Sequence, residues 1–598
     1  MQRAATLAAR GLARTTETAA ALLLILVTLL NLTQVGGRYF FATGFSWTEE
    51  LMRYAMIWLM MLGSVACVFR AEHMGIQTLE ALAPPRHARH VRSATYSVAA
   101  VFCAIVLLYG YPLALRNAAQ SAPASGIPMI LPYLALARGH GADAAPDRAQ
   151  LAFRLRARRR RGRRGCIPGP GGAMIWVAAL GLGLLFVGVP VAFALGLAGV
   201  LGVWLAGIPL GVTATRLFTG VDSFVFLAVP FYILAAEIMS QGGITARLIA
   251  IASAATGRLR GGTAFANIGS SVLFAGISGS AVADAAALGR VFCEEMPKEG
   301  YTREYSAAVT AASSIVGPII PPSGLAIIMA AVTGLSVIDL FLAGVLPGLL
   351  LAGACAAVVV VDALRGRVPK PRRARTVDDA GRLRMWVEAL AVITLPLIIV
   401  GGMIAGIYTA TEGGGIAVAY ATFLSVAVFR VMTLQGLWLA FLRAARTSAS
   451  IYLLVAAATI LSYALNILGI SRWVADVARF FDGNPVLFLF AVAALMLVLG
   501  TFLDIGAAIL IFAPLLMPVV RQLGIDPMQA AMVIMLTLAM GLLTPPVGVV
   551  LFVMMRVGRV GLTPLIRALA PFLLAQLAAI AVLCLVPGVS TFLPDLLN

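Results

Sequence analysis

The chain has 598 residues, of which 61% are apolar and 12% are charged, and its mean hydropathy is +0.97. A soluble protein is about half apolar and about a quarter charged, so this composition leaves too little polar surface for a water-soluble fold. The net charge of +19 comes from arginine-rich runs between apolar stretches, a pattern that sets membrane orientation. We therefore expect an all-α polytopic membrane protein, and we exclude a cytosolic enzyme, a nucleic-acid-binding protein and a disordered scaffold.

The first quarter of the chain contains three apolar stretches long enough to span a bilayer, near 18–40, 51–69 and 93–115. Arginines precede the first stretch and separate the second from the third. The positive-inside rule therefore places the N-terminus and the 70–92 loop in the cytoplasm. These features predict a small helical membrane region over residues 1–137.

Residues 138–173 differ in kind from the stretches on either side. They are rich in Arg, Ala, Gly and Pro, and eight of the eleven residues from Arg154 to Arg164 are arginine. No apolar periodicity persists there, so we interpret this segment as a linker and not as a span.

Apolar character returns at Met174 and continues to the end of the chain, over a large region that we take as 174–598. A basic cytoplasmic loop at 363–385 divides this region. The division predicts a first repeat at about 174–362 and a second at about 386–598.

The two repeats contain corresponding motifs. Gly276–Asp284 has a counterpart in Gly500–Asp504, and Gly317–Gly324 has one in Gly541–Gly548. Two Gly/Pro-interrupted apolar segments at matching positions are the sequence sign of a secondary transporter's binding site. We expect two inverted repeats, each with a helical hairpin and a helix broken at Pro-Pro.

Each Pro-Pro pair removes two backbone donors within an apolar run and breaks the helix. The freed carbonyls and the flanking Ser or Thr hydroxyls are hard oxygen ligands, which suit a small alkali cation. Asp284 and Asp504 lie in the hairpin-like stretches, where an acid costs about 2.5–3.5 kcal/mol at the bilayer centre. Either acid could contact the ion or hydrogen-bond a hairpin tip, and for Glu237 and Glu412 a structural and a functional role are equally open.

The large region lacks the residues that would couple transport to a histidine proton relay or to ATP. No histidine lies beyond His140, so sodium is a simpler coupling ion than a proton relay, although a carboxylate proton carrier stays open. The chain has two lysines, Lys298 and Lys370, and neither belongs to a P-loop. The HExxH and GxSxG motifs are absent from the sequence. We therefore expect no enzyme and no cofactor, with sodium as the coupling ion.

At these motifs the large region resembles the large (M) membrane subunit of tripartite ATP-independent periplasmic (TRAP) transporters. The first quarter resembles the small (Q) subunit, so that the chain looks like a fused Q–M protein. The motifs that carry the first resemblance are Gly242–Thr245, Ala275–Asp284, Ala311–Ser323, Gly401–Gly406, Thr409–Glu412, Gly524–Pro527 and Gly541–Gly548, and those that carry the second are Asn31, Arg38–Tyr39, Ser46–Leu51, Trp58, Gly63 and His73.

The resemblance implies elevator-type, sodium-coupled uptake of C4-dicarboxylates or related small carboxylates across the bacterial inner membrane, with delivery by a periplasmic binding protein. It implies that the Q part buttresses the M scaffold, and that lipid but no nucleic acid is bound. By motif match, one sodium site comprises Ser278, Ser280, Gly317, Ile320 and Pro322, and the second comprises Thr501, Asp504, Thr544 and Pro546. Asp284 and Glu412 would support the hairpins, and Ser313, Ser314 and Ser323 could face the substrate.

Two departures from the family pattern stand out. Thr537 occupies a position where the family leads us to expect Asn. A Q subunit should also have a fourth span after Ile127–Tyr133, where this chain enters the arginine-rich linker instead. Three spans would place that linker outside the cell, against the positive-inside rule. We hypothesise that 138–173 is a frameshifted or degenerate remnant of the fourth helix, which resequencing the gene would test.

Two alternative functions remain at this stage. A stand-alone ion-coupled anion symporter would need no binding protein, but it would have no use for a separate Q-like region. A channel would need a continuous polar lining, whereas the polar residues here gather at two places.

Overall fold

A computed structural model describes residues 2–70, 85–137, 170–369, 379–481, 483–545 and 547–597. Within these ranges the chain is helical, apart from its connections and one isolated bridge between Ser121 and Pro128. Eight of the described helices are long and apolar enough to cross a membrane, or up to ten if each of two bent pairs forms one span. The predicted all-α polytopic fold is confirmed.

The chain divides into two compact units that interleave in sequence. Unit 1 comprises Met1–Phe224 and Ala445–Asp476, and unit 2 comprises Val225–Ala444 and Val477–Asn598. One boundary falls inside the long helix α19, Leu434–Ile467. The first 51 residues of the predicted large region, 174–224, therefore fold with the N-terminal helices.

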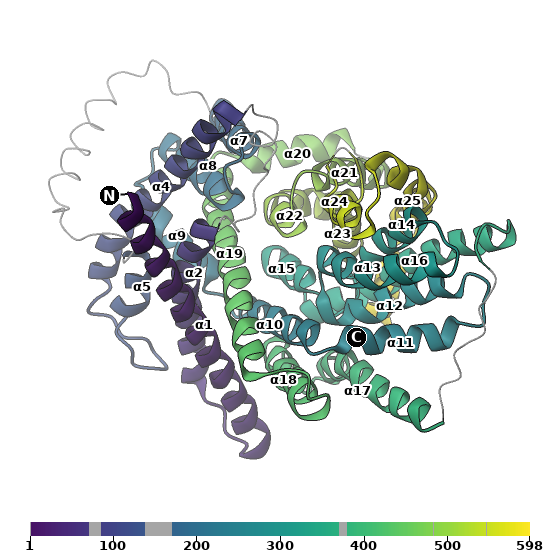
Figure 1. The fold of residues 1–598 in the computed structure, drawn as a ribbon. Helices are drawn as coiled ribbons and strands as arrows, with labels where there is room; N and C mark the ends of the chain where they lie inside the picture. Colours follow the sequence, from purple (N-terminus) through teal and green to yellow (C-terminus); the bar gives the residue numbers. More distant parts are fainter. Residues whose placement is uncertain are drawn as a thin grey trace. The chain divides into compact units, whose positions relative to one another are not determined.

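Unit 1 contains a helix over each of the three predicted N-terminal spans, and α1 and α2 pack along each other (Figure 1). Small residues bring the C-terminal part of α19 close to other helices of this unit. A Cβ on Gly199 would lie 2.7 Å from the Leu461 nitrogen, which only a glycine permits. The complete helices of unit 1 are α1 (Gln2–Phe40), α2 (Ser46–Arg70), α4 (Pro85–Arg116), α5 (Ile130–Ala137), α7 (Pro170–Val187), α8 (Val191–Leu205) and α9 (Gly211–Val221).

The predicted linker over 138–173 falls almost entirely outside the described residues. Helix α7 begins at Pro170, so the last four residues of that segment are helical. Proline at the first helical position has no N–H to lose and a backbone angle already suited to a helix.

Unit 2 contains two groups of four helices in the same chain order, drawn in teal and yellow-green in Figure 1. The first group is α12 (Gly262–Ser278), α13 (Ala281–Lys298), α14 (Arg303–Ser314) and α15 (Gly324–Thr333). The second is α21 (Pro485–Gly500), α22 (Ile505–Gln522), α23 (Pro527–Gly541) and α24 (Val549–Gly558). The other helices that begin in unit 2 are η1 (Val225–Leu227), α10 (Ala228–Gln241), α11 (Ile244–Thr256), α16 (Val337–Leu364), α17 (Asp379–Ile404), α18 (Ala410–Phe423), η2 (Leu424–Val428), α19, α25 (Leu562–Leu585) and α26 (Gly588–Leu597), and α20 (Ile470–Phe480) begins in unit 1 and ends in unit 2.

Glycine and proline determine where these groups are interrupted. Helix α14 stops at Ser314 and α15 starts at Gly324, and the segment between them carries three prolines. Helix α23 stops at Gly541, before the second Pro-Pro pair. In both groups the described helix therefore ends before the Pro-Pro pair.

The two groups also pack on each other within unit 2. Helix α13 contacts α24, and α15 contacts α22. A Cβ on Gly289 of α13 would lie 3.2 Å from the sulfur of Met554 on α24, which shows how closely these helices approach. That the groups are inverted repeats stays a prediction.

Candidate functional site

The first candidate site lies where the connection between α12 and α13 meets the break after α14. Ser278 ends α12, and its hydroxyl donates a hydrogen bond to Oδ1 of Asp284. Asp284 is fully buried, and its Oδ2 has no hydrogen-bond partner. A methyl group at Gly317 would overlap that same oxygen. The structure therefore brings Ser278, Asp284 and Gly317 together.

Backbone carbonyls complete this first site. A Cβ on Gly276 would lie 3.3 Å from the Pro321 oxygen, and one on Gly279 would lie 3.9 Å from the Pro322 oxygen. Helices α12 and α14 both end here, and helix C-termini carry a partial negative charge from unpaired carbonyls. The arrangement favours a small cation.

The second candidate site also lies at two helix ends. Gly500 at the end of α21 and Gly541 at the end of α23 are in backbone contact, because a Cβ on Gly500 would lie 3.2 Å from the Gly541 Cα. Thr501 and Thr544 follow these helix ends, and their hydroxyls donate to the Val498 and Met540 carbonyls at 2.8 Å and 3.0 Å. The fourth predicted residue, Pro546, lies outside the described residues.

Asp504 is the N-cap of α22, the helix that follows Thr501 in the second candidate site. Its Oδ1 accepts hydrogen bonds from the N–H groups of Gly506 at 2.9 Å and Ala507 at 3.4 Å. Asp504 is an exposed residue in the structure, in contrast to the buried Asp284. The two acids of the duplicated motif thus occupy different environments.

Two helix N-termini lie side by side between the two groups. A Cβ on Gly506, near the start of α22, would lie 3.6 Å from the Leu325 side chain, near the start of α15. Ser323 caps α15 by accepting from the Ala326 N–H at 3.2 Å, and its own hydroxyl donates to the Pro318 carbonyl. Paired helix N-termini carry partial positive charge and favour an anionic group such as a carboxylate.

The remaining predicted residues take part in local hydrogen bonds. Ser313 accepts from the Ser271 hydroxyl at 2.8 Å, and the Ser314 hydroxyl donates to the Ala311 carbonyl at 2.8 Å. Both serines are fully buried, so their contact with substrate stays a prediction. Ser280 caps α13, and Ile320 packs against Gly348 of α16.

Glu412 belongs to the start of α18. Its Oε2 accepts from the backbone N–H of Thr409 at 2.9 Å, and Thr409 Oγ1 accepts from the Glu412 N–H at 3.3 Å, which forms a capping box. The expected support of a hairpin by Glu412 stays a prediction. Thr537, found in place of the expected Asn, donates to the Val533 carbonyl of its own helix at 2.6 Å.

The sequence did not lead us to predict a set of buried, hydrogen-bonded polar side chains on α12, α14 and α25. Asn267 of α12 donates to the Thr310 hydroxyl of α14 at 2.7 Å. Gln576 of α25 donates to the Ala312 carbonyl at 2.8 Å. Asn267, Ser271 and Ser278 share one face of α12 at spacings of four and seven residues, and this periodicity was the available signal.

Comparison with known families decides between the alternatives. Residues 178–589 match the family described as tripartite ATP-independent periplasmic transporter, DctM component. Residues 24–142 match the DctQ component of the same transporters. The chain belongs to the TRAP transporter family. It carries the large and the small membrane component in one polypeptide, as the sequence motifs predicted.

Curated relatives from several bacteria support this assignment. The isethionate TRAP transporter permease protein DctMQ of Oleidesulfovibrio alaskensis is 30% identical over 580 residues, which cover 91% of this chain and 88% of that protein. The sialic acid TRAP transporter large permease SiaM of Vibrio cholerae is 34% identical over 419 residues, covering 69% and 97%. The C4-dicarboxylate TRAP transporter large permease DctM of Rhodobacter capsulatus is 32% identical over 435 residues, covering 70% and 98%.

Membership of the TRAP family has three consequences for this chain. It is a multi-pass inner-membrane protein and a component of a TRAP-type organic acid transporter. Its relatives are transporter permeases and not enzymes. TRAP permeases work with a periplasmic substrate-binding protein.

Proposed function

We propose that this chain imports a small carboxylate, a C4-dicarboxylate or a related organic acid, in symport with sodium. The periplasmic binding protein delivers the substrate, and unit 2 carries it across the membrane by an elevator-type movement. The observation that carries the proposal is the similar construction of the two candidate sites, each of which lies near two helix ends and contains a close contact made by a glycine.

The first candidate site supports sodium coupling through the Oδ2 atom of Asp284, which has no hydrogen-bond partner. The Asp284 Oδ2 atom is buried without a partner, beside Gly317 and the carbonyls of the first break. A buried carboxylate oxygen costs free energy unless it has a hydrogen bond or a counter-charge. A sodium ion held by Ser278, Ser280 and the carbonyls of Gly317, Ile320 and Pro322 would supply the counter-charge nearby.

The second candidate site supports a sodium site whose acid, Asp504, is more exposed than Asp284. Asp504 is exposed, and it lies three residues beyond Thr501 at the end of α21. The negative end of that helix and the Asp504 carboxylate both attract a cation. Thr501, Thr544 and Asp504 would hold this second ion, together with the proposed contribution of Pro546.

The adjacent N-termini of α15 and α22 support a carboxylate as substrate. Ser323 and Asp504 cap these two helices, and the start of α22 contacts the start of α15. A carboxylate placed there would interact with the partial positive charge of two helix N-termini. A sodium ion beside Asp504 would neutralise that acid, so sodium would have to bind before the anion.

The interleaving of the two units supports an elevator-type movement. Both broken helices and both tips belong to unit 2, whereas the Q-like helices and residues 445–467 of α19 belong to unit 1. A chain divided in this way can keep one unit fixed in the membrane while the other carries the bound ions and the substrate.

Sodium-dependent thermal stability of the purified chain tests the cation sites without requiring transport. A ligand that binds only the folded state raises the free energy of unfolding by about 2.7 kcal/mol at a hundred times its dissociation constant. We expect sodium to raise the melting temperature above its value in potassium or choline at equal ionic strength. Equal melting temperatures in all three salts would contradict the proposal.

Two serine variants, one in the first candidate site and one outside both sites, form a matched pair for this assay. Ser278→Ala removes the hydroxyl that contacts Asp284, and it should reduce the sodium-specific shift. Ser336→Ala removes an exposed cap of α16, whose hydroxyl accepts from the Asp339 N–H at 3.3 Å. The control should lower the melting temperature equally in sodium and potassium.

A further inference from the structure

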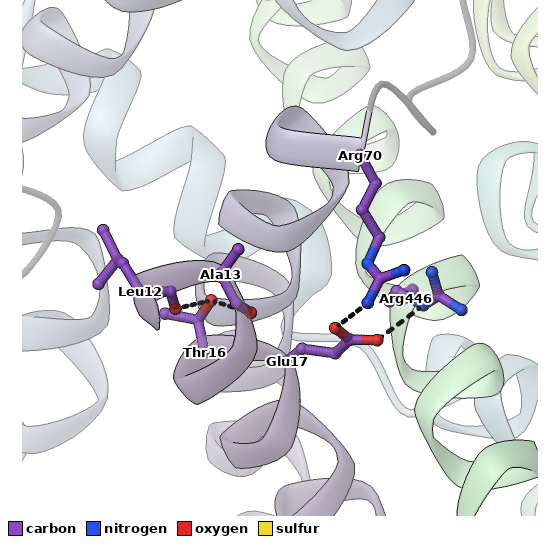
Figure 2. A network of polar contacts seen from close by, with 6 residues as sticks. All are labelled: Leu12, Ala13, Thr16, Glu17, Arg70 and Arg446. Carbon is purple, nitrogen blue, oxygen red and sulfur yellow. Dashed lines mark hydrogen bonds and ion pairs between the residues drawn. The ribbon is translucent and has the colours of Figure 1, made fainter. Parts of the chain in front are cut away.

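A buried carboxylate in unit 1 belongs to a cluster that the candidate sites do not use. Glu17 lies on α1 with its side chain 6% exposed, and its Oε2 pairs with Arg70 at 2.7 Å. Its Oε1 pairs with Arg446 at 3.3 Å. Figure 2 shows the carboxylate between the two guanidinium groups, which come from α2 and α19.

The two arginines differ in their access to solvent. The Arg446 side chain is 14% exposed, whereas that of Arg70 is 43% exposed. Removing one partner of a buried ion pair is strongly destabilising, because the other charge remains buried without compensation. The Glu17–Arg446 contact should therefore matter more than the Glu17–Arg70 contact.

The same part of α19 has two further contacts with α2. The Cys67 thiol donates to the backbone carbonyl of Arg446 at 3.4 Å. Gly63 lies so close to Ala449 that a Cβ would overlap its methyl group, and it lies near the Ala445 carbonyl. Residues 445–449 of α19 are thus held by an ion pair, a hydrogen bond and close helix packing.

We propose that Glu17 is a positioning residue that fixes α19 against α1 and α2. The Q-like region would thereby hold a helix of the M-like region through one carboxylate shared by two arginines. The contact lies within the part of α19 that belongs to unit 1, which begins at Ala445. The proposal does not depend on sodium coupling or on the substrate.

Cys67 provides a native reporter for this contact. It is 1% exposed and bonded to the α19 backbone, so it reacts with a thiol reagent only when α2 and α19 separate. The full chain, with Cys103, Cys166, Cys293, Cys355 and Cys584 replaced by serine, would be placed in lipid nanodiscs. The rate of modification by N-ethylmaleimide is then measured.

We expect Glu17→Gln to raise the labelling rate of Cys67 by about tenfold or more, because local opening follows the loss of the buried pair. Adding Arg446→Gln to Glu17→Gln should return the rate toward that of the parent, because the buried guanidinium is then gone and the charge that remains, on Arg70, is 43% exposed and solvated. Arg70→Gln alone should have a smaller effect than Arg446→Gln alone.

Arg53→Gln is the matched control. It breaks an ion pair of the same length, 2.7 Å from Asp222, and it lies on the same helix about 21 Å from Cys67 along the axis. It should leave the labelling rate unchanged. An equal rise in Arg53→Gln and Glu17→Gln, or no rise in Glu17→Gln, would overturn the proposal.

Folding failure would itself be informative. If Glu17→Gln gives no monodisperse chain on size-exclusion chromatography, the yield of monodisperse chain becomes the readout. Recovery of the yield in the Glu17→Gln/Arg446→Gln variant supports an ionic anchor, and no recovery contradicts it. Labelling requires no uptake, so a negative result here is separate from any failure of sodium-coupled transport.

Discussion

The Oδ2 atom of Asp284 occupies the space that a side chain at Gly317 would need. Asp284 is in the first turn of α13, and Gly317 lies in the break between α14 and α15. The acid of the first hairpin and the glycine of the first broken helix therefore form one contact, although 33 residues separate them in the chain.

Gly317→Ala should disrupt the first cation site. A methyl group there would displace the Asp284 carboxylate, and overpacking of this kind costs about 1–3 kcal/mol. We expect weaker sodium activation of uptake, measured in proteoliposomes across a series of sodium concentrations. Gly353→Ala, in the interior of α16, is the control, because a Cβ there meets no atom within 4 Å. Equal sodium activation in the two variants would contradict this account of the contact.

Asp504→Asn should separate the two roles of this residue. Asparagine is as good an N-cap as aspartate, so the start of α22 should persist while the negative charge is lost. We expect the sodium concentration for half-maximal uptake to rise about tenfold or more, equivalent to about 1.4 kcal/mol of binding free energy. Asp504→Ala should lose about a further 1 kcal/mol of stability with the cap. Unchanged sodium dependence in Asp504→Asn would exclude it as a cation ligand.

Gly541→Ala should destabilise the fold by about 1–3 kcal/mol, because the new methyl group would overlap the backbone of Gly500. Thermal unfolding followed by circular dichroism measures the effect. Gly353→Ala, in the interior of α16, has no atom within 4 Å of its new Cβ and should be neutral or stabilising by about 0.5–1 kcal/mol. The reverse order of melting temperatures would show that the two helix ends are not in contact.

Glu412→Gln distinguishes a cap from an electrostatic support of a hairpin. Glutamine also completes a capping box, so the stability of α18 should change little if capping is the role of Glu412. Thr409→Ala removes the cap and should cost about 1 kcal/mol. The two variants are compared by thermal unfolding and by sodium-dependent uptake. Loss of sodium dependence in Glu412→Gln, with stability preserved, would favour the hairpin role instead.

Much of the fold was predictable because its signals are local. Apolar stretches of bilayer length predicted the N-terminal spans, and Pro-Pro pairs predicted where α14 and α23 end. The family resemblance assigned Gly317 to a sodium site and Asp284 to the support of a hairpin, but the contact between the two residues was not predicted. No local pattern shows which glycine faces which acid, because that depends on how two helices pack.

Other features of the structure left no readable signal in the sequence. Glu17 is a single acid in an N-terminal helix, and its partner Arg446 lies more than 400 residues away. The grouping of residues 445–467 with the N-terminal helices likewise depends on tertiary packing at positions such as Gly63 and Gly199. Asp284 and Asp504 occupy matching sequence positions, but their different exposure depends on which residues pack around each of the two candidate sites.

Uptake by the reconstituted chain tests the central claim most directly. Proteoliposomes carrying the chain would be supplied with its periplasmic binding protein and a panel of labelled organic acids, with and without an inward sodium gradient. The account predicts uptake only when sodium and the binding protein are both present. Sodium-driven uptake without the binding protein, or uptake that ignores the sodium gradient, would contradict it.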